Sequence, residues 1–201
     1  MTNTPKNIEV EMRSQFSQDD YTRIYRYLMQ NAQHLGADDK ELHFYIYSDK
    51  LLKVANNITK QTAKISLKLN RIGAGNDFEE FEIYIGKNEI ETALKMMQVM
   101  TQDQVTYQYA YNIRDNFSYD GVEIALKYSN TWGYHAEFEI MVGDTSHILQ
   151  AENDISLIAD KLGVSIMTQN ELKTVTRAID TGYTQGKYTK SDTNLPTRPV
   201  I

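Results

Sequence analysis

Ile8-Glu9-Val10-Glu11-Met12-Arg13 is the stretch that decides the fold. In a strand, successive side chains point to opposite faces, so the two glutamates and the arginine share one face and the three apolar side chains share the other. If helices cover the apolar face, the charged face points into the space that the sheet encloses. Charged side chains persist there only when they are paired, hydrated or bound to a ligand or a metal. The stretch therefore predicts a strand whose inner side is charged.

Strand patterns dominate the rest of the chain. Residues with alternating or strand-forming character predict strands over 42–47, 51–55, 62–70, 78–85, 105–114, 119–128 and 134–142. Glycine-rich residues 73–77 are expected to turn the third of these strands into the fourth. Together with the opening stretch, the sequence predicts an α+β fold with an antiparallel sheet of eight strands, either open or closed into a barrel.

Apolar residues at helical spacing predict four helices, over residues 17–35, 87–100, 146–162 and 168–181. Ser17 and Asn88 are expected to cap the first two at their N-termini, and Gly36 is expected to end the first. Residues 1–201 are expected to form one domain, with a core over about 7–183 and a polar, mobile tail over about 186–201.

Composition excludes several kinds of site. The chain has 201 residues and no cysteine, so disulfides, thiolate zinc sites and cysteine nucleophiles are excluded, and a metal must bind oxygen or imidazole. The net charge of -6 argues against non-specific binding to nucleic acid, which needs a clustered positive surface. The sequence shows no apolar run near membrane-spanning length and no secretory leader, which favours a cytoplasmic protein without a membrane partner.

Charge at every second position recurs on the later strands. Like charges stand two residues apart in Glu80 and Glu82, and again in Glu137 and Glu139, and such pairs repel unless a cation lies between them. Basic side chains lie on strands or near strand ends at Lys53, Lys64, Lys68, Arg114 and Lys127. A solvated sheet face explains each strand taken alone. The joint pattern favours a polyphosphate ligand with divalent cations, since Mg²⁺ or Mn²⁺ binds carboxylates and phosphate oxygens together.

Five segments, taken in order, resemble a known family. They are IEVEMR (8–13), LLKVAN (51–56), AKISLKLN (63–70), FEEFEIYI (78–85) and DGVEIALKYSNTWGYHAEFEI (120–140). The first is similar to the Glu-x-Glu-x-Lys/Arg signature of the CYTH superfamily, the triphosphate tunnel metalloenzymes, and the others resemble later strands of that family. The resemblance implies an eight-stranded antiparallel β-barrel with flanking helices, whose bore binds a triphosphate together with Mg²⁺ or Mn²⁺.

The resemblance also implies roles for individual residues. The metal ligands or water activators would be Glu9, Glu11, Glu137 and Glu139. The groups that bind the substrate would be Arg13, Lys53, Lys68, Arg114, Glu80 and Glu82. Of all these, Glu11, Glu139 and Arg114 are expected to act in catalysis. The sequence departs from the family at Lys127, where an aspartate is usual, and at Ala55, where a second arginine is usual.

Three functions remain open on this evidence. The leading prediction is a metal-dependent triphosphatase, a phosphohydrolase acting on inorganic, nucleoside or thiamine triphosphate. The alternatives are a class IV adenylate cyclase, which makes cyclic AMP from ATP, and a non-catalytic binder of polyphosphate or nucleotide. The expected partner is a small-molecule triphosphate, and a homodimer is left open.

Overall fold

The computed structural model describes residues 8–69, 77–102, 105–188 and 196–199. Its strands are β1 (Ile8–Gln15), β2 (Gln33–Ala37), β3 (Lys40–Ile46), β4 (Lys50–Asn57), β5 (Thr62–Leu69), β6 (Asp77–Ile85), β7 (Thr106–Tyr119), β8 (Val122–Ser129) and β9 (Gly133–Val142). Its α-helices are α1 (Gln18–Asn31), α2 (Ile90–Met100), α3 (Ile148–Leu162) and α4 (Gln169–Thr184). Short 3₁₀ turns at Lys87–Glu89 and Thr145–His147 precede α2 and α3.

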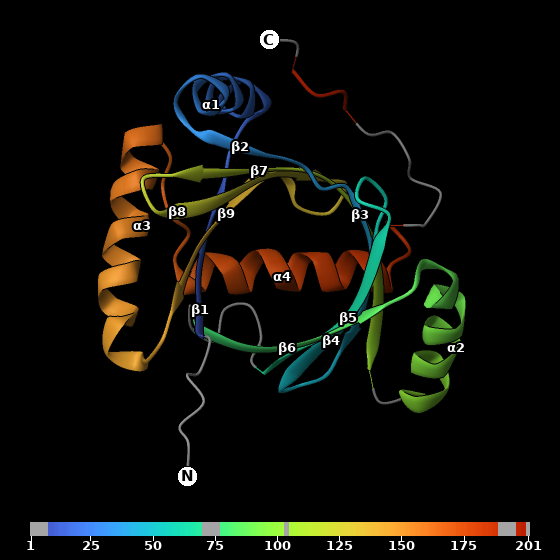
Figure 1. The fold of residues 1–201 in the computed structure, drawn as a ribbon. Coiled ribbons are helices and arrows are strands. Elements are labelled where there is room, and N and C mark those ends of the chain that lie inside the picture. The colour runs from blue at the N-terminus through green and yellow to red at the C-terminus, as the bar shows by residue number, and fades with distance from the viewer. Residues whose placement is uncertain (1–7, 70–76, 103–104, 189–195, 200–201) are drawn as a thin grey trace.

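The strands close into a barrel. They pair antiparallel in the order β7-β3-β4-β5-β6-β1-β9-β8, and β8 pairs with β7 to complete the ring (Figure 1). The predicted α+β fold with an eight-stranded antiparallel barrel is therefore confirmed, and the open sheet is excluded. The ninth strand, β2, pairs with residues 115–118 of β7, beyond the residues 106–112 that pair with β3.

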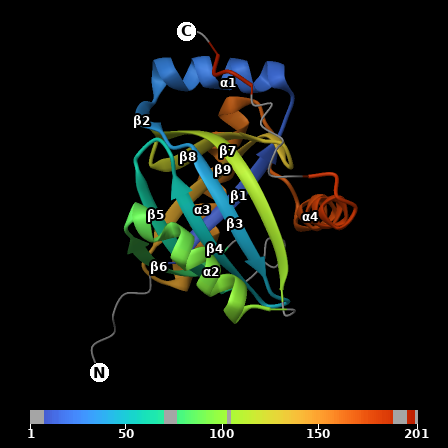
Figure 2. The ribbon, with the colours of Figure 1, turned by 90° about the vertical axis from the view of Figure 1, so that its right-hand side faces the viewer.

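Helices cover the barrel on one side and at one end. The apolar face of β1 packs with the outer faces of β7 to β9 against α1 and α3, and Val10, Phe117 and Phe138 lie fully buried in this core. Helix α4 instead lies across one end of the barrel, as the two perpendicular views show (Figures 1 and 2). The main apolar core therefore lies outside the barrel, between its wall and the two helices α1 and α3. Among the described helices, none is long and apolar enough to cross a membrane.

The first helix is shorter than predicted. It ends at Asn31, and residues 33–37, predicted as helix and helix end, form β2. The apolar stripe of α1 stops at Leu28, so further turns would bury nothing, whereas pairing with β7 satisfies the backbone. Gly36, with φ +99°, lies at a β-bulge in this pairing and does not cap the helix.

Strand and cap predictions near the other turns have mixed outcomes. Strand β7 continues past the predicted end to Tyr119, because Asp120 and Gly121 both adopt positive φ and form a two-residue hairpin turn into β8. Ser17 caps α1 as predicted, but Asn88 lies inside a 3₁₀ turn and caps nothing. Most of the predicted 73–77 turn, and residues 189–195 and 200–201 of the predicted tail, lie outside the described residues.

Candidate functional site

The barrel encloses a cavity of about 260 Å³. All ten residues predicted for the site line it: Glu9, Glu11, Arg13, Lys53, Lys68, Glu80, Glu82, Arg114, Glu137 and Glu139. They come from six strands, namely β1, β4, β5, β6, β7 and β9. Alternation on each strand places these side chains on the inner face, while their apolar neighbours point outward.

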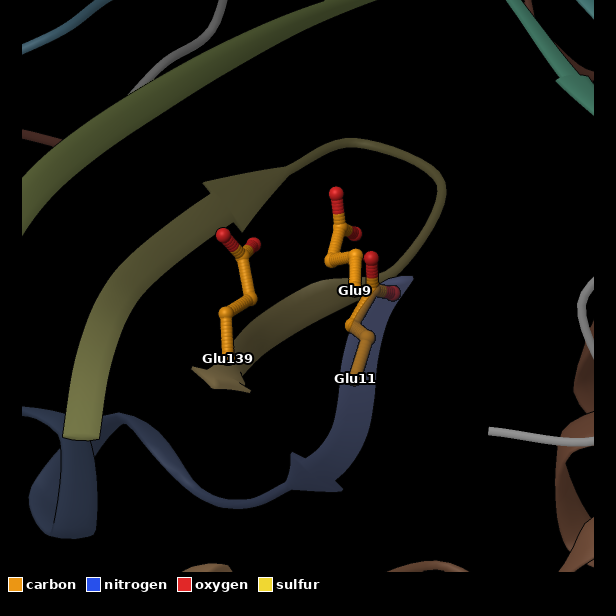
Figure 3. Close-up of side chains that lie close together, drawn as sticks. All are labelled: Glu9, Glu11 and Glu139. Carbon is orange, nitrogen blue, oxygen red and sulfur yellow. The ribbon is translucent and has the colours of Figure 1, made fainter. Parts of the chain in front are cut away.

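Strand register brings acids from distant parts of the chain together. In the pairing of β1 with β9, Glu11 lies opposite Glu139 and Arg13 lies opposite Glu137. Carboxylate oxygens of Glu9, Glu11 and Glu139 lie within 4.8 Å of one another, and Figure 3 shows the three side chains converging from the two strands. We call these three residues the carboxylate triad.

Cations compensate the carboxylate triad incompletely. The ammonium of Lys68 donates hydrogen bonds to Glu9 (2.7 Å) and Glu11 (3.1 Å), and Arg13 forms an ion pair with Glu11. Glu139 has a more distant partner, since its carboxylate lies 3.8 Å from the guanidinium of Arg114.

The titration behaviour of the triad reflects this imbalance. Burial raises the pKa of Glu9 to about 8, although Lys68 acts in the opposite direction. Burial also raises the pKa of Glu139, and the nearby charge of Glu11 adds to the effect. Burial opposes ionisation of Glu11 as well, but Arg13 and Lys68 hold its pKa below the ordinary value. A divalent cation would relieve the repulsion in the triad, and three carboxylates suit the hard ions Mg²⁺ and Mn²⁺.

Glu137 lies in a different environment. Its carboxylate accepts a hydrogen bond from Lys127 and lies 3.0 Å from a guanidinium nitrogen of Arg13 and 3.8 Å from one of Arg114. Despite burial, these three cations hold the pKa of Glu137 well below its ordinary value. The structure thus surrounds Glu137 with bases and leaves it out of the carboxylate triad, so its predicted role as a metal ligand stays a prediction.

The bases of the cavity are arranged on several sides. The guanidinium of Arg114 is oriented by Asn116, whose amide oxygen accepts from Nε at 2.6 Å. Lys53 lies 3.7 Å from Glu80, and burial lowers the pKa of this lysine. Glu82 forms an ion pair with Lys64. The predicted bases therefore stand around one space, each held by an acid or an amide.

Two features of the cavity escaped the sequence analysis. Lys40 lines the cavity and forms a 2.6 Å ion pair with the buried Asp38. Helix α4 contributes further lining, and its Asp180 accepts a hydrogen bond from Gln108 at 2.6 Å. Strand alternation could have located Lys40, because it stands two residues before Leu42 and therefore lies on the same face of β3, and both side chains line the cavity. The position of α4 has no local sequence signal.

The raised pKa of Glu9 predicts a pH dependence of stability in the metal-free protein. The folded-state pKa of about 8 lies above the ordinary glutamate value of 4.5, so the folded state binds the extra proton and stability falls as pH rises between these values. Burial lowers the pKa of His135 from its ordinary value of 6.5 to about 3, so this group makes stability rise with pH between those two values. Between pH 6.5 and 8, Glu9→Gln should therefore reduce the loss of Tm seen in the wild type. Thermal melts of the wild type and Glu9→Gln in chelator, at several pH values between 6.5 and 8, measure the change of Tm with pH. The same change of Tm with pH in both proteins would contradict the prediction.

No family model matches this sequence, and no curated protein matches it by sequence. Solved structures do match. A protein from Pyrococcus horikoshii has a TM-score of 0.67 at 17% identity, over 84% of this chain and 99% of that chain. A proposed adenylate cyclase from Vibrio parahaemolyticus has a TM-score of 0.63 at 17% identity, over 85% of this chain and 98% of that chain.

A third solved structure matches over most of this chain. A proposed adenylyl cyclase from Hippeastrum, described as having a dominant triphosphatase activity, has a TM-score of 0.59 at 14% identity, over 92% of this chain and 99% of that chain. At such identities the likeness concerns the fold. The barrel fold expected from the resemblance to the CYTH superfamily is confirmed by these structures and by the closed sheet.

Proposed function

We propose that this chain, built on the CYTH barrel fold, is a metal-dependent phosphohydrolase that cleaves a triphosphate inside the barrel. The observation that carries the proposal is the carboxylate triad, which lies in one enclosed cavity with Arg13, Lys53, Lys68 and Arg114. Hydrolysis of a phosphoanhydride needs its oxygens neutralised and a water aligned, with little covalent help from the protein. An interior with acids and bases supplies both requirements.

Each group has a defined task in this proposal. The four bases bind the phosphate oxygens, and Asn116 keeps the Arg114 guanidinium in place. Glu9, Glu11 and Glu139 would hold Mg²⁺ or Mn²⁺, which supplies charge neutralisation at the phosphate oxygens when bound. The oxygen of a water attacks the terminal phosphorus, and the bond from that phosphorus to the bridging oxygen breaks. Orthophosphate is released, the bridging oxygen leaves with the electron pair on the remaining diphosphate end, and the proton of the water passes to a carboxylate oxygen of Glu139.

A panel of substrates tests the proposal. Purified protein is incubated with Mg²⁺ or Mn²⁺ and inorganic triphosphate, ATP or thiamine triphosphate, and released phosphate is measured. The expected result is metal-dependent release that a chelator abolishes. Failure of every substrate to yield phosphate above a protein-free control would refute the hydrolase.

One side of the cavity suits an organic group. Apolar side chains from β3, β4, β7 and α4 line it: Leu42, Phe44, Ile46, Leu51, Ala55, Ala110 and Ile179. The charged side chains lie mainly on the other strands. An inorganic triphosphate gains nothing from an apolar surface, whereas a nucleoside or thiamine group does. We therefore expect an organic triphosphate to be the better substrate.

Phe44→Ala tests this expectation. The variant should raise the KM for ATP or thiamine triphosphate about 10-fold, since stacking on an aromatic ring contributes roughly 1–3 kcal/mol per base, and leave the KM for inorganic triphosphate unchanged. Phe81→Ala, on the outer face of β6 and 53% exposed, is the matched control. Equal effects on both kinds of substrate would contradict a role of Phe44 in binding the organic group.

The apolar side also keeps the cyclase as a second candidate, because that reaction needs ATP. The same site would then direct the ribose 3′-hydroxyl, in place of water, at the phosphorus nearest the ribose. Mass analysis of the products from ATP separates the two reactions: cyclic AMP with pyrophosphate indicates the cyclase, and ADP with phosphate indicates the hydrolase.

A further inference from the structure

The cavity contains an ammonium group that the proposed reaction does not use. Lys127 lies on β8, its residue is 5% exposed, and its Nζ donates a hydrogen bond to Glu137. Strand register places it opposite Arg114 on β7 and opposite His135 on β9. The resemblance implies a metal-binding carboxylate at this position, so Lys127 reverses the expected charge there.

The surroundings of Glu137 leave no place for a dication. Lys127, Arg13 and Arg114 all approach its carboxylate, the last two at 3.0 and 3.8 Å. An incoming Mg²⁺ or Mn²⁺ would meet three positive charges in a buried site, where such repulsion is poorly screened. Lys127 is itself buried and pairs directly with the Glu137 carboxylate, so its ammonium lies where such an ion would have to bind.

The carboxylate triad presents the opposite situation. Its oxygens lie within 4.8 Å of one another, and Lys68 is shared between Glu9 and Glu11. Glu139 lies 3.8 Å from the guanidinium of Arg114, beyond hydrogen-bond distance. One acidic group in the bore therefore gains from a divalent ion, and the other is already neutralised by the chain itself.

We propose that the Lys127 ammonium is a built-in cation that replaces a second divalent ion beside Glu137, so that the protein binds a single metal ion at Glu9, Glu11 and Glu139. This rests on the proposed function only for the presence of a metal at the triad. A fixed ammonium neutralises Glu137 at any metal concentration. The activity should then follow a one-ion dependence on Mg²⁺ or Mn²⁺.

The count of bound ions tests the proposal without any measurement of activity. Mn²⁺ alone is titrated into the full chain, and free Mn²⁺ is followed by its electron paramagnetic resonance signal. The wild type and Lys127→Arg should bind one ion, whereas Lys127→Asp, which restores a carboxylate beside Glu137, should bind two. Lys95→Asp makes the same charge change on the exposed face of α2 and should leave the count at one.

Circular dichroism checks the fold of each variant. If Lys127→Asp does not fold, Lys127→Asn takes its place in the test. Its amide oxygen is a neutral ligand at the same position, and this variant should bind a second ion more weakly than the first. Two ions in the wild type, or one ion in a folded Lys127→Asp, would overturn the proposal. One ion without hydrolysis would refute the proposed function alone, hydrolysis with two ions would refute the inference alone, and no bound ion would refute both.

Discussion

Replacing Glu11 by glutamine is expected to lower kcat for metal-dependent triphosphate hydrolysis by about 100- to 1,000-fold, the range found when one group that stabilises transition-state charge is removed. Glu11 is the most buried member of the carboxylate triad, and it is ionised because Arg13 and Lys68 hold it so. The amide keeps the shape but carries no charge, so both the metal and the two bases lose their common partner.

Glu91→Gln is the matched control for this prediction. This substitution makes the same chemical change on the exposed first turn of α2, outside the cavity, and should leave kcat unchanged. Steady-state rates and Mn²⁺ affinity are measured for both variants. Wild-type kcat in a folded Glu11→Gln protein would show that the triad takes no part in the reaction.

The residues of the site could be predicted because their signal is local. Glu9, Glu11 and Arg13 alternate with apolar residues in one strand, and an alternation of this kind fixes which side chains share a face. The same rule places Glu137 with Glu139. The covering of β1 by α1 and α3 then decides that the charged face is the inner one.

The grouping inside the cavity could not be predicted in the same way. Glu137 and Glu139 stand two residues apart on β9, so strand alternation places both on the inner face and does not distinguish them. In the structure, Glu137 is surrounded by bases, whereas Glu139 belongs to the carboxylate triad. The difference arises from the register of β1 against β9 and from Lys127 on β8, and register between distant strands follows from the closure of the whole barrel.

Strand β2 and helix α4 show a second limit of the sequence. Residues 33–37 carry no alternating apolar pattern and become a strand only because β7 offers its backbone edge. The sequence predicts a helix over 168–181, and Thr168 forms a capping box at the start of α4, but the place of this helix across the end of the barrel depends on contacts such as that of Asp180 with Gln108. Local sequence determines the helix, and tertiary packing determines where it lies.

Replacing Lys68 by methionine is expected to produce a loss of stability that divalent metal reverses. The ammonium bridges Glu9, Glu11 and Glu80, and its side chain is 13% exposed. Removing one partner from a buried ion pair costs about 3–5 kcal/mol, because the remaining charges are left uncompensated. For a chain of this size we expect a fall in Tm of roughly 6–20 °C in chelator.

Metal should restore much of this loss, because Mg²⁺ or Mn²⁺ at the carboxylate triad neutralises the same acids that Lys68 neutralises in the free protein. Lys64→Met is the matched control, since Lys64 lies on the same inner face of β5 but pairs with the more exposed Glu82 and should change Tm little with or without metal. Thermal melts of both variants in chelator and in Mn²⁺ make the comparison. A folded Lys68→Met protein whose Tm does not respond to Mn²⁺ would mean that lysine and metal do not share one acidic site, and the chemistry proposed for the bore would lose its basis.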